Sequence, residues 1–138
     1  MAFIADIVSS EKELFKGEIK LLVAPGSQGE LGILPGHTPL LTRLKSGCVS
    51  VTTPDDQVQH IYVSGGILEV QPHQVTLLLD TGIRAVDLDE AAILAAKSRA
   101  EELMANHSEL FDLAETEANL IQAIHQLRTL EKLRNSRK

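Results

Sequence analysis

The first 85 residues alternate between short apolar runs and turn-forming residues. Ile61 and Val63 alternate with His60 and Tyr62, so the period-two pattern puts the first pair on one face of a strand and the second pair on the other. Turn signals such as Pro54-Asp55-Asp56 separate these runs. About eight to ten short strands over this length predict a β-sandwich or a flattened barrel.

The pattern changes near residue 86. All five prolines lie at or before Pro72, and no glycine or proline follows residue 86. Asp87, with Glu90 three residues later, predicts a helix start with a capping box. The apolar spacing predicts one helix over 88–104, a break near Asn106–Ser108, and a second helix from about 112 to 134.

The two helices are expected to form an antiparallel hairpin. Ala91, Ala92 and Ala95 suggest a face of small residues on the first helix that the second helix approaches closely. The predicted fold class is α+β, with a β-sandwich domain at 1–85 and a helical hairpin domain at 86–138.

Charge is distributed unevenly along the chain. The formal net charge of -6 disfavours a general nucleic-acid binder. Residues 120–138 nevertheless hold five basic residues and a single acid, Glu131. This basic end indicates either a specific acidic partner or a solvated helix terminus, where cations are favoured by the helix dipole.

The segment Gly26–Leu41 is rich in glycine and proline. Its three evenly spaced glycines suggest a phosphate loop, but no lysine follows them, and Pro35 and Pro39 exclude the helix that such a loop requires. The segment is therefore expected to form a shaped surface. Glu30 is expected to project from a tight turn in it, either as a contact residue or as a solvated acid.

No catalytic or metal-binding constellation is visible in the sequence. No two of the five histidines have the i, i+4 spacing of a helical metal site. Cys48 is the single cysteine, which excludes a disulfide within the chain and a cysteine metal cluster. No apolar run reaches the roughly 18 residues of a membrane span, so any membrane association is expected to go through a partner.

Four stretches, in matching order and spacing, resemble the epsilon-subunit family of bacterial F-type ATP synthases. The resemblance covers essentially the whole chain. The stretches are Asp6-Ile-Val-Ser9, Gly29-Glu-Leu-Gly-Ile-Leu-Pro-Gly-His37 with Pro39-Leu-Leu41, Val63-Ser-Gly-Gly-Ile-Leu-Glu-Val70 with Pro72, and Asp87-Leu-Asp-Glu-Ala91.

The resemblance implies a ten-stranded sandwich with two C-terminal helices, in a non-catalytic subunit of the central stalk. Such a subunit contacts the gamma subunit and the c-ring and couples proton flow to ATP synthesis, at the cytoplasmic face of the bacterial inner membrane. Glu30, Gly32 and His37 are then the expected contact residues for the c-ring and gamma.

The resemblance further implies that the hairpin can leave the sandwich, extend towards the alpha and beta subunits of the catalytic head, and inhibit ATP hydrolysis. Arg128, Lys132 and Arg134 are the matching candidates for contact with an acidic segment of beta. This role would account for the basic C-terminal helix.

Some members of the family bind ATP on the folded hairpin through an Ile/Leu-Asp-x-x-Arg-Ala pattern. This chain retains Asp89 and Arg99, but Ala92 stands in place of the arginine and Ile93 in place of the alanine. Since charged donors hold phosphates most strongly, weak or absent ATP binding is expected, and no cofactor. A free-standing nucleotide-sensing module of the same fold is the alternative, and Ala92 argues against it.

Overall fold

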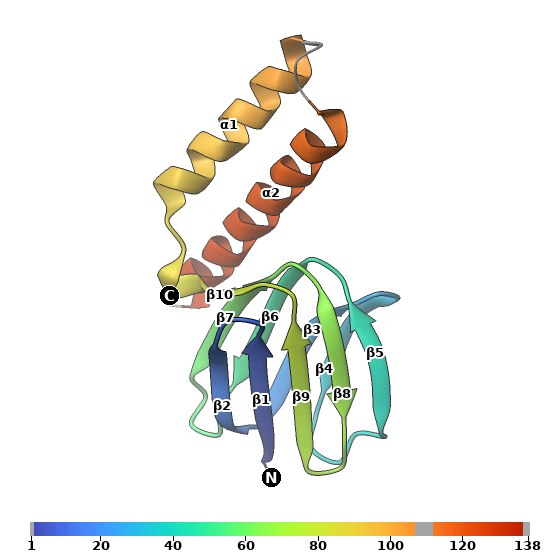
Figure 1. The fold of residues 1–138 in the computed structure, drawn as a ribbon. Helices are drawn as coiled ribbons and strands as arrows, with labels where there is room; N and C mark the ends of the chain where they lie inside the picture. Colours follow the sequence, from blue (N-terminus) through green and yellow to red (C-terminus); the bar gives the residue numbers. More distant parts are fainter. Residues whose placement is uncertain (1, 107–111, 137–138) are drawn as a thin grey trace.

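The computed structural model describes residues 2–106 and 112–136, which form a β-sandwich with two helices stacked on one end (Figure 1). The predicted α+β class and order of elements are confirmed. The elements are β1 (Phe3–Ser9), β2 (Glu13–Ile19), β3 (Leu21–Gly26), β4 (Gly29–Ile33), β5 (Leu40–Leu44), β6 (Gly47–Thr52), β7 (Val58–Val63), β8 (Gly66–Val70), β9 (Gln74–Leu79), β10 (Gly82–Arg84), the 3₁₀ turn η1 (Ala85–Asp87), α1 (Glu90–Asn106) and α2 (Leu113–Ser136).

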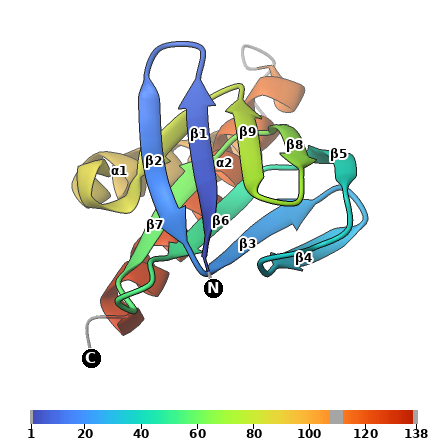
Figure 2. The same cartoon turned by 90° about the horizontal axis from the view of Figure 1, so that it is seen from below.

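All ten strands belong to one continuous sheet that folds into two layers (Figure 2). Its order is β10-β7-β6-β3-β5-β8-β9-β1-β2, and β4 pairs only with β3. Neighbours are antiparallel except β1 and β9, which are parallel. Alternate residues of each strand point inward, so the core consists almost entirely of Leu, Ile, Val and Ala, including the fully buried Ile7, Leu22, Ile61 and Leu77.

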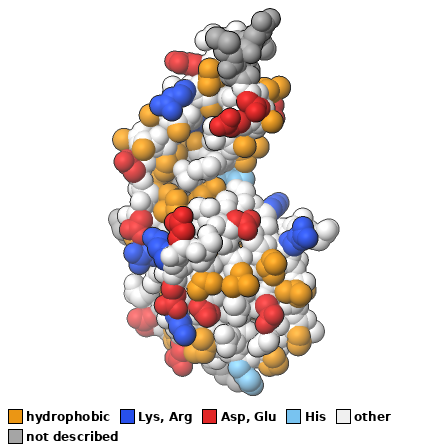
Figure 3. Space-filling model, viewed as in Figure 1, with side chains coloured by type: hydrophobic (Ala, Val, Ile, Leu, Met, Phe, Trp, Pro, Cys, Tyr) orange, Lys and Arg blue, Asp and Glu red, His pale blue; other side chains and the backbone are white. Residues whose placement is uncertain are grey.

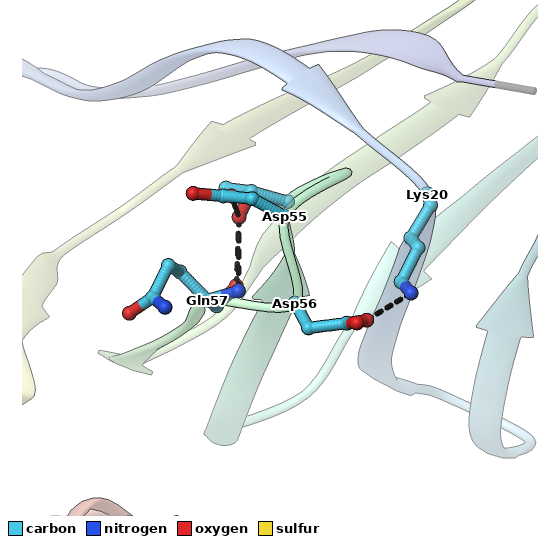
Figure 4. A network of polar contacts seen from close by, with 5 residues as sticks. Lys20, Asp55, Asp56 and Gln57 are labelled. Atoms are coloured by element: carbon cyan, nitrogen blue, oxygen red, sulfur yellow. Dashed lines mark hydrogen bonds and ion pairs between the residues drawn. The ribbon is translucent and has the colours of Figure 1, made fainter.

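The turn between β6 and β7 is fixed by side chains rather than by glycine. Asp56 adopts a positive φ of 68°, and its carboxylate forms an ion pair with Lys20 (Figure 4). The hydroxyl of Thr53 donates to the Asp55 carboxylate, and the Gln57 amide donates to the Thr53 hydroxyl at 3.1 Å. Aspartate is among the residues that best tolerate this left-handed conformation, which explains the predicted turn at Pro54-Asp55-Asp56.

The cap of the first helix differs from the prediction. Asp89, not Asp87, caps α1, since its carboxylate accepts a hydrogen bond from the Ala92 amide at 3.2 Å. Asp87 instead lies in η1 and pairs with Arg84 at 3.0 Å. Asp112 caps α2 in the same way as Asp89. The predicted break begins at the end of α1, and residues 107–111 lie outside the described part of the chain.

The face through which the helices pack also differs from the prediction. Ala91, Ala92 and Ala95 are exposed. The helices meet instead through a small apolar cluster that includes Ile93 of α1 with Ala123 and Leu130 of α2. Ile93 takes the central position because it buries more apolar area than an alanine would. In the described ranges, neither helix is long and apolar enough to cross a membrane.

Candidate functional site

Glu30 and Gly32 lie on an edge strand, and the predicted tight turn around Glu30 is wrong. Both residues are in β4, where Glu30 pairs with Pro25 of β3 and Gly32 with Val23. Period-two alternation turns Leu31 inward, so that Glu30 and Gly32 are exposed on the same face of the strand. The turn itself is two residues earlier, between β3 and β4.

His37 lies in the connection between β4 and β5. This connection is at the end of the sandwich remote from the helices (Figure 1). Its Nδ1 lies 2.6 Å from the carbonyl oxygen of Thr38, and Gly36 before it adopts a positive φ of 79°. The structure therefore does not gather Glu30 and His37 on one loop, because Glu30 belongs to β4 and His37 to the connection that follows β4.

The fold of the chain does not require a glycine at position 32. The φ of Gly32 is not in the left-handed region, and an added Cβ would meet no atom within 4 Å. By contrast, an added Cβ at Gly26 would lie 2.7 Å from the Gly29 carbonyl oxygen. Gly32 thus leaves the outer surface of β4 open to close approach from outside.

The second helix docks on the sandwich over β6 and β7. The predicted alternation puts His60 and Tyr62 on the face of β7 opposite Ile61 and Val63, and all four residues are buried. The sandwich core covers one face of β7 and α2 covers part of the other. Alternation predicted which residues share a face, but it could not show that both faces are covered.

Two serine–histidine contacts lie at this interface. Ser46 Oγ, in the turn between β5 and β6, lies 2.5 Å from Nδ1 of His125 on α2. Ser50 Oγ of β6 lies 2.7 Å from Nδ1 of His60 on β7. Sequence reasoning missed both contacts. Ser46 and His125 are 79 residues apart, so no local pattern connects them.

The basic residues of α2 lie beside the sandwich. Arg128 and Lys132 line a pocket of about 230 Å³ together with Lys45 and Glu30. None of the ion pairs formed within the described residues involves Arg128, Lys132 or Lys45. The predicted contact acid and two of the predicted inhibitory cations therefore share a pocket when the helices are docked.

The remaining predicted site residues lie on the hairpin. Arg134 forms an ion pair with Glu90 at the start of α1, which ties the two helices together. Asp89 is engaged as the cap of α1, and Arg99 is exposed on the same helix. No group of three or more potential metal ligands occurs among residues 2–106 and 112–136.

An apolar patch lies on the outer face of the other layer, where hydrophobic side chains form a band across the sandwich (Figure 3). Leu78 of β9 is opposite Ile67 of β8 and Val8 of β1, and Leu78 and Ile67 are 53% and 46% exposed. The three residues line a shallow depression of about 310 Å³. Large apolar side chains gathered on an exposed face indicate a surface that binds another protein.

Two family models match the chain. Residues 2–85 match the ATP synthase, Delta/Epsilon chain, beta-sandwich domain, and residues 87–131 match the ATP synthase, Delta/Epsilon chain, long alpha-helix domain. The ATP synthase epsilon chain of Nitrosococcus oceani is 52% identical over 134 residues, which is 97% of this chain and 96% of that one. The epsilon chain of Stenotrophomonas maltophilia is 53% identical over 96% of this chain and 95% of that one.

Solved structures share the fold at low identity. A chain in the mitochondrial ATP synthase of Euglena gracilis, solved as OSCP/F1/c-ring, has a TM-score of 0.70 at 20% identity, covering 99% of this chain and 82% of that one. A chain in the central stalk/c-ring of the Tetrahymena thermophila mitochondrial enzyme has a TM-score of 0.58 at 13% identity, with 94% and 97% covered.

Proposed function

The chain belongs to the epsilon-chain family of F-type ATP synthases, and from this premise we propose that it is a non-catalytic subunit of the central stalk. In this role it turns with the gamma subunit and the c-ring and couples proton flow to ATP synthesis. The observation that carries the proposal is the match to epsilon chains at 52% identity over 97% of the chain, through both the sandwich and the hairpin.

The apolar patch of Val8, Ile67 and Leu78 is the proposed docking face for gamma. A subunit that must stay attached to a rotating shaft needs a contact that excludes water, and apolar side chains supply it. The patch lies on the layer opposite the docked α2, so gamma and the docked hairpin can occupy the sandwich together.

Glu30, Gly32 and His37 are the proposed contacts with the c-ring. The two solved structures with this fold come from assemblies that include a c-ring. The unneeded glycine at position 32 supports the proposal, because it lets a partner backbone come close to β4. Through these contacts the chain is held at the cytoplasmic face of the bacterial inner membrane.

The hairpin is the proposed regulatory element. Docked on the sandwich, it leaves the catalytic head free; extended, it reaches the alpha and beta subunits and inhibits hydrolysis. Arg128 and Lys132 are suited to this exchange because the described structure gives them no ion pair to lose when α2 leaves. Arg134 gives up its ion pair with Glu90 when the hairpin extends. Because both side chains are exposed, the loss of this ion pair costs about 1 kcal/mol or less.

The two proposed faces of the sandwich should fail separately when each is changed. In membranes that carry the assembled enzyme, Leu78→Asp should release the subunit from gamma, since it places a charge in an apolar contact. Glu30→Lys should leave the subunit bound to gamma but lower proton-driven ATP synthesis. Retention on purified gamma and the rate of synthesis in inverted vesicles measure the two effects.

Matched controls separate these effects from general damage. Leu94→Asp changes a similarly exposed leucine on α1, and Glu18→Lys reverses an exposed acid on β2. Both should behave as the unchanged chain does. Normal retention of Leu78→Asp on gamma would refute the assigned docking face, and normal synthesis with Glu30→Lys would refute the c-ring contact.

We expect the isolated chain to bind ATP weakly or not at all. Asp89 already accepts the capping hydrogen bond of α1, and the side chain of Ala92 has no donor for a phosphate. Isothermal titration with ATP should therefore show no saturable heat in the micromolar range. A micromolar dissociation constant would favour the alternative of a nucleotide-sensing module.

A further inference from the structure

The interface between α2 and the sandwich contains two histidines that the proposed function leaves unexplained. His125 reaches down from α2 to Ser46, and His60 reaches from β7 to Ser50. His60 is only 8% exposed, and its Nε2 is buried without a hydrogen-bond partner. His60 lines a pocket of about 260 Å³ together with Leu133 of α2 and Ala85 of η1.

Most of the charged groups that face these histidines are cations. Arg128 of α2 and Lys45 of the β5–β6 turn act on His125. Lys132 of α2 acts on His60, which shares its pocket with Arg84 of β10. The carboxylates nearby are Glu30 of β4, which lines the pocket that holds His125 and Lys132, and Asp87 of η1, which pairs with Arg84. The Cys48 thiol of β6 lines the same pocket as Glu30. Burial raises the pKa of the Tyr62 hydroxyl, which stays neutral.

The hydrogen bonds favour neutral rings. A neutral imidazole has one donor and one acceptor nitrogen, whereas a protonated ring has two donors and needs two acceptors. His60 has a partner only at Nδ1, so the charged form would bury an unpaired N–H at Nε2. An unpaired buried donor beside a cation is costly, and removing α2 would relieve both the burial and the charge of Lys132.

We propose that His60 and His125 form a pH-sensitive latch, which holds the hairpin on the sandwich while both rings are neutral and loosens it when they are protonated. The latch rests on the reversible docking proposed above. It adds a regulatory input to that docking, because acidification shifts the chain towards the undocked hairpin.

The direction of the pH effect follows from the two histidines. Burial, and then the nearby cations, lower the pKa of His60 and of His125 in the docked state. Undocking removes the burial of both rings and separates His60 from Lys132 and His125 from Lys45, so the pKa of each returns towards the ordinary value of about 6.5, although Arg128 stays beside His125 on α2. Docking is therefore fully stable above about pH 6.5 and weakens as the pH falls below it, by about tenfold in the docking equilibrium for each unit of pKa difference at each histidine.

Cys48 gives a probe of this equilibrium in the unaltered chain. It is the only cysteine, and it lines the pocket that α2 covers. Its rate of alkylation by iodoacetamide would be measured on the isolated full chain from pH 8 to pH 5.5. The reference is the double variant His60→Phe/His125→Gln at each pH, because the ratio of rates removes the pH dependence of thiol chemistry itself.

The ratio should rise about tenfold as the pH falls from 7.5 to 5.5, since only the unaltered chain loses docking. His73→Gln changes an exposed histidine in the β8–β9 turn and should leave that rise unchanged. If alkylation depends on pH equally in the unaltered chain and the double variant, the ratio of their rates stays constant. That result would overturn the latch but not the docking. No alkylation at any pH in either protein would overturn the latch together with the proposed mobility of the hairpin.

Discussion

An ATP synthase whose epsilon chain ends at residue 86 should hydrolyse ATP about fivefold faster or more than one with the full chain, which is the lower end of typical allosteric coupling. The truncation removes α1 and α2, and with them the proposed inhibitory contacts of Arg128, Lys132 and Arg134. The rate of hydrolysis by the purified assembly, with and without the hairpin, measures the effect.

The structure indicates that this truncation spares the sandwich. Among residues 2–106 and 112–136, the sandwich core contains eighteen buried residues, none of them from the helices, whereas the cluster between the helices contains three. The free energy that holds the hairpin together and in place is therefore modest, as a reversible element requires. Binding to gamma through Val8, Ile67 and Leu78 should be unchanged, because the patch lies on the other layer.

A double substitution tests whether the inhibition depends on the charges of α2 rather than on the presence of the helices alone. Arg128→Gln with Lys132→Gln removes two cations and leaves the helix intact, and it should reproduce much of the increase. Glu101→Gln with Glu102→Gln changes two exposed charges on α1 and should have no effect. Unchanged hydrolysis by the truncated enzyme would refute the regulatory role, although the coupling role would stand.

The fold was predictable because its determinants are local. Strand alternation, turn chemistry and the loss of glycine and proline after residue 86 gave the sandwich and the hairpin in order. The wrong details share a cause, which is that local pattern does not report tertiary coverage. Alternation separated His60 from Ile61 but could not show that α2 covers the face of His60. The small residues around Ala91 suggested a packing face, whereas the larger Ile93 fills the space between the helices.

The candidate site was predictable only in part for the same reason. The segment that holds Glu30 and His37 stood out by composition, but Glu30 shares a pocket with residues of α2, whereas His37 lies in the β4–β5 connection at the remote end of the sandwich. The contacts of Ser46 with His125 and of Ser50 with His60 depend on pairings between distant segments. A single sequence carries no signal for them beyond the presence of the residues.

Replacing Gly66 with alanine should destabilise the sandwich by about 3 kcal/mol or more, the largest stability loss we expect from a single substitution. Gly66 begins β8 with a φ of 154°, a conformation that side-chain-bearing residues rarely adopt. An added Cβ would lie 2.3 Å from the backbone carbonyl oxygen of Leu78, so the two strands would have to separate. Since β8 lies between β5 and β9, separation on one side disturbs the whole layer.

Urea unfolding of the isolated full chain would measure this loss through the fluorescence of Tyr62, the only tyrosine, which is buried in β7. Gly32→Ala is the matched control, because an added Cβ there meets nothing, and its free energy of unfolding should change by about 0.5 kcal/mol or less.

The two glycines therefore have different roles. Gly66 is required by the chain's own fold, whereas Gly32 should be needed only in the assembled enzyme, where Gly32→Ala should lower coupling without lowering stability. Equal midpoints for the two variants would show that Gly66 is not the constraint that its geometry indicates.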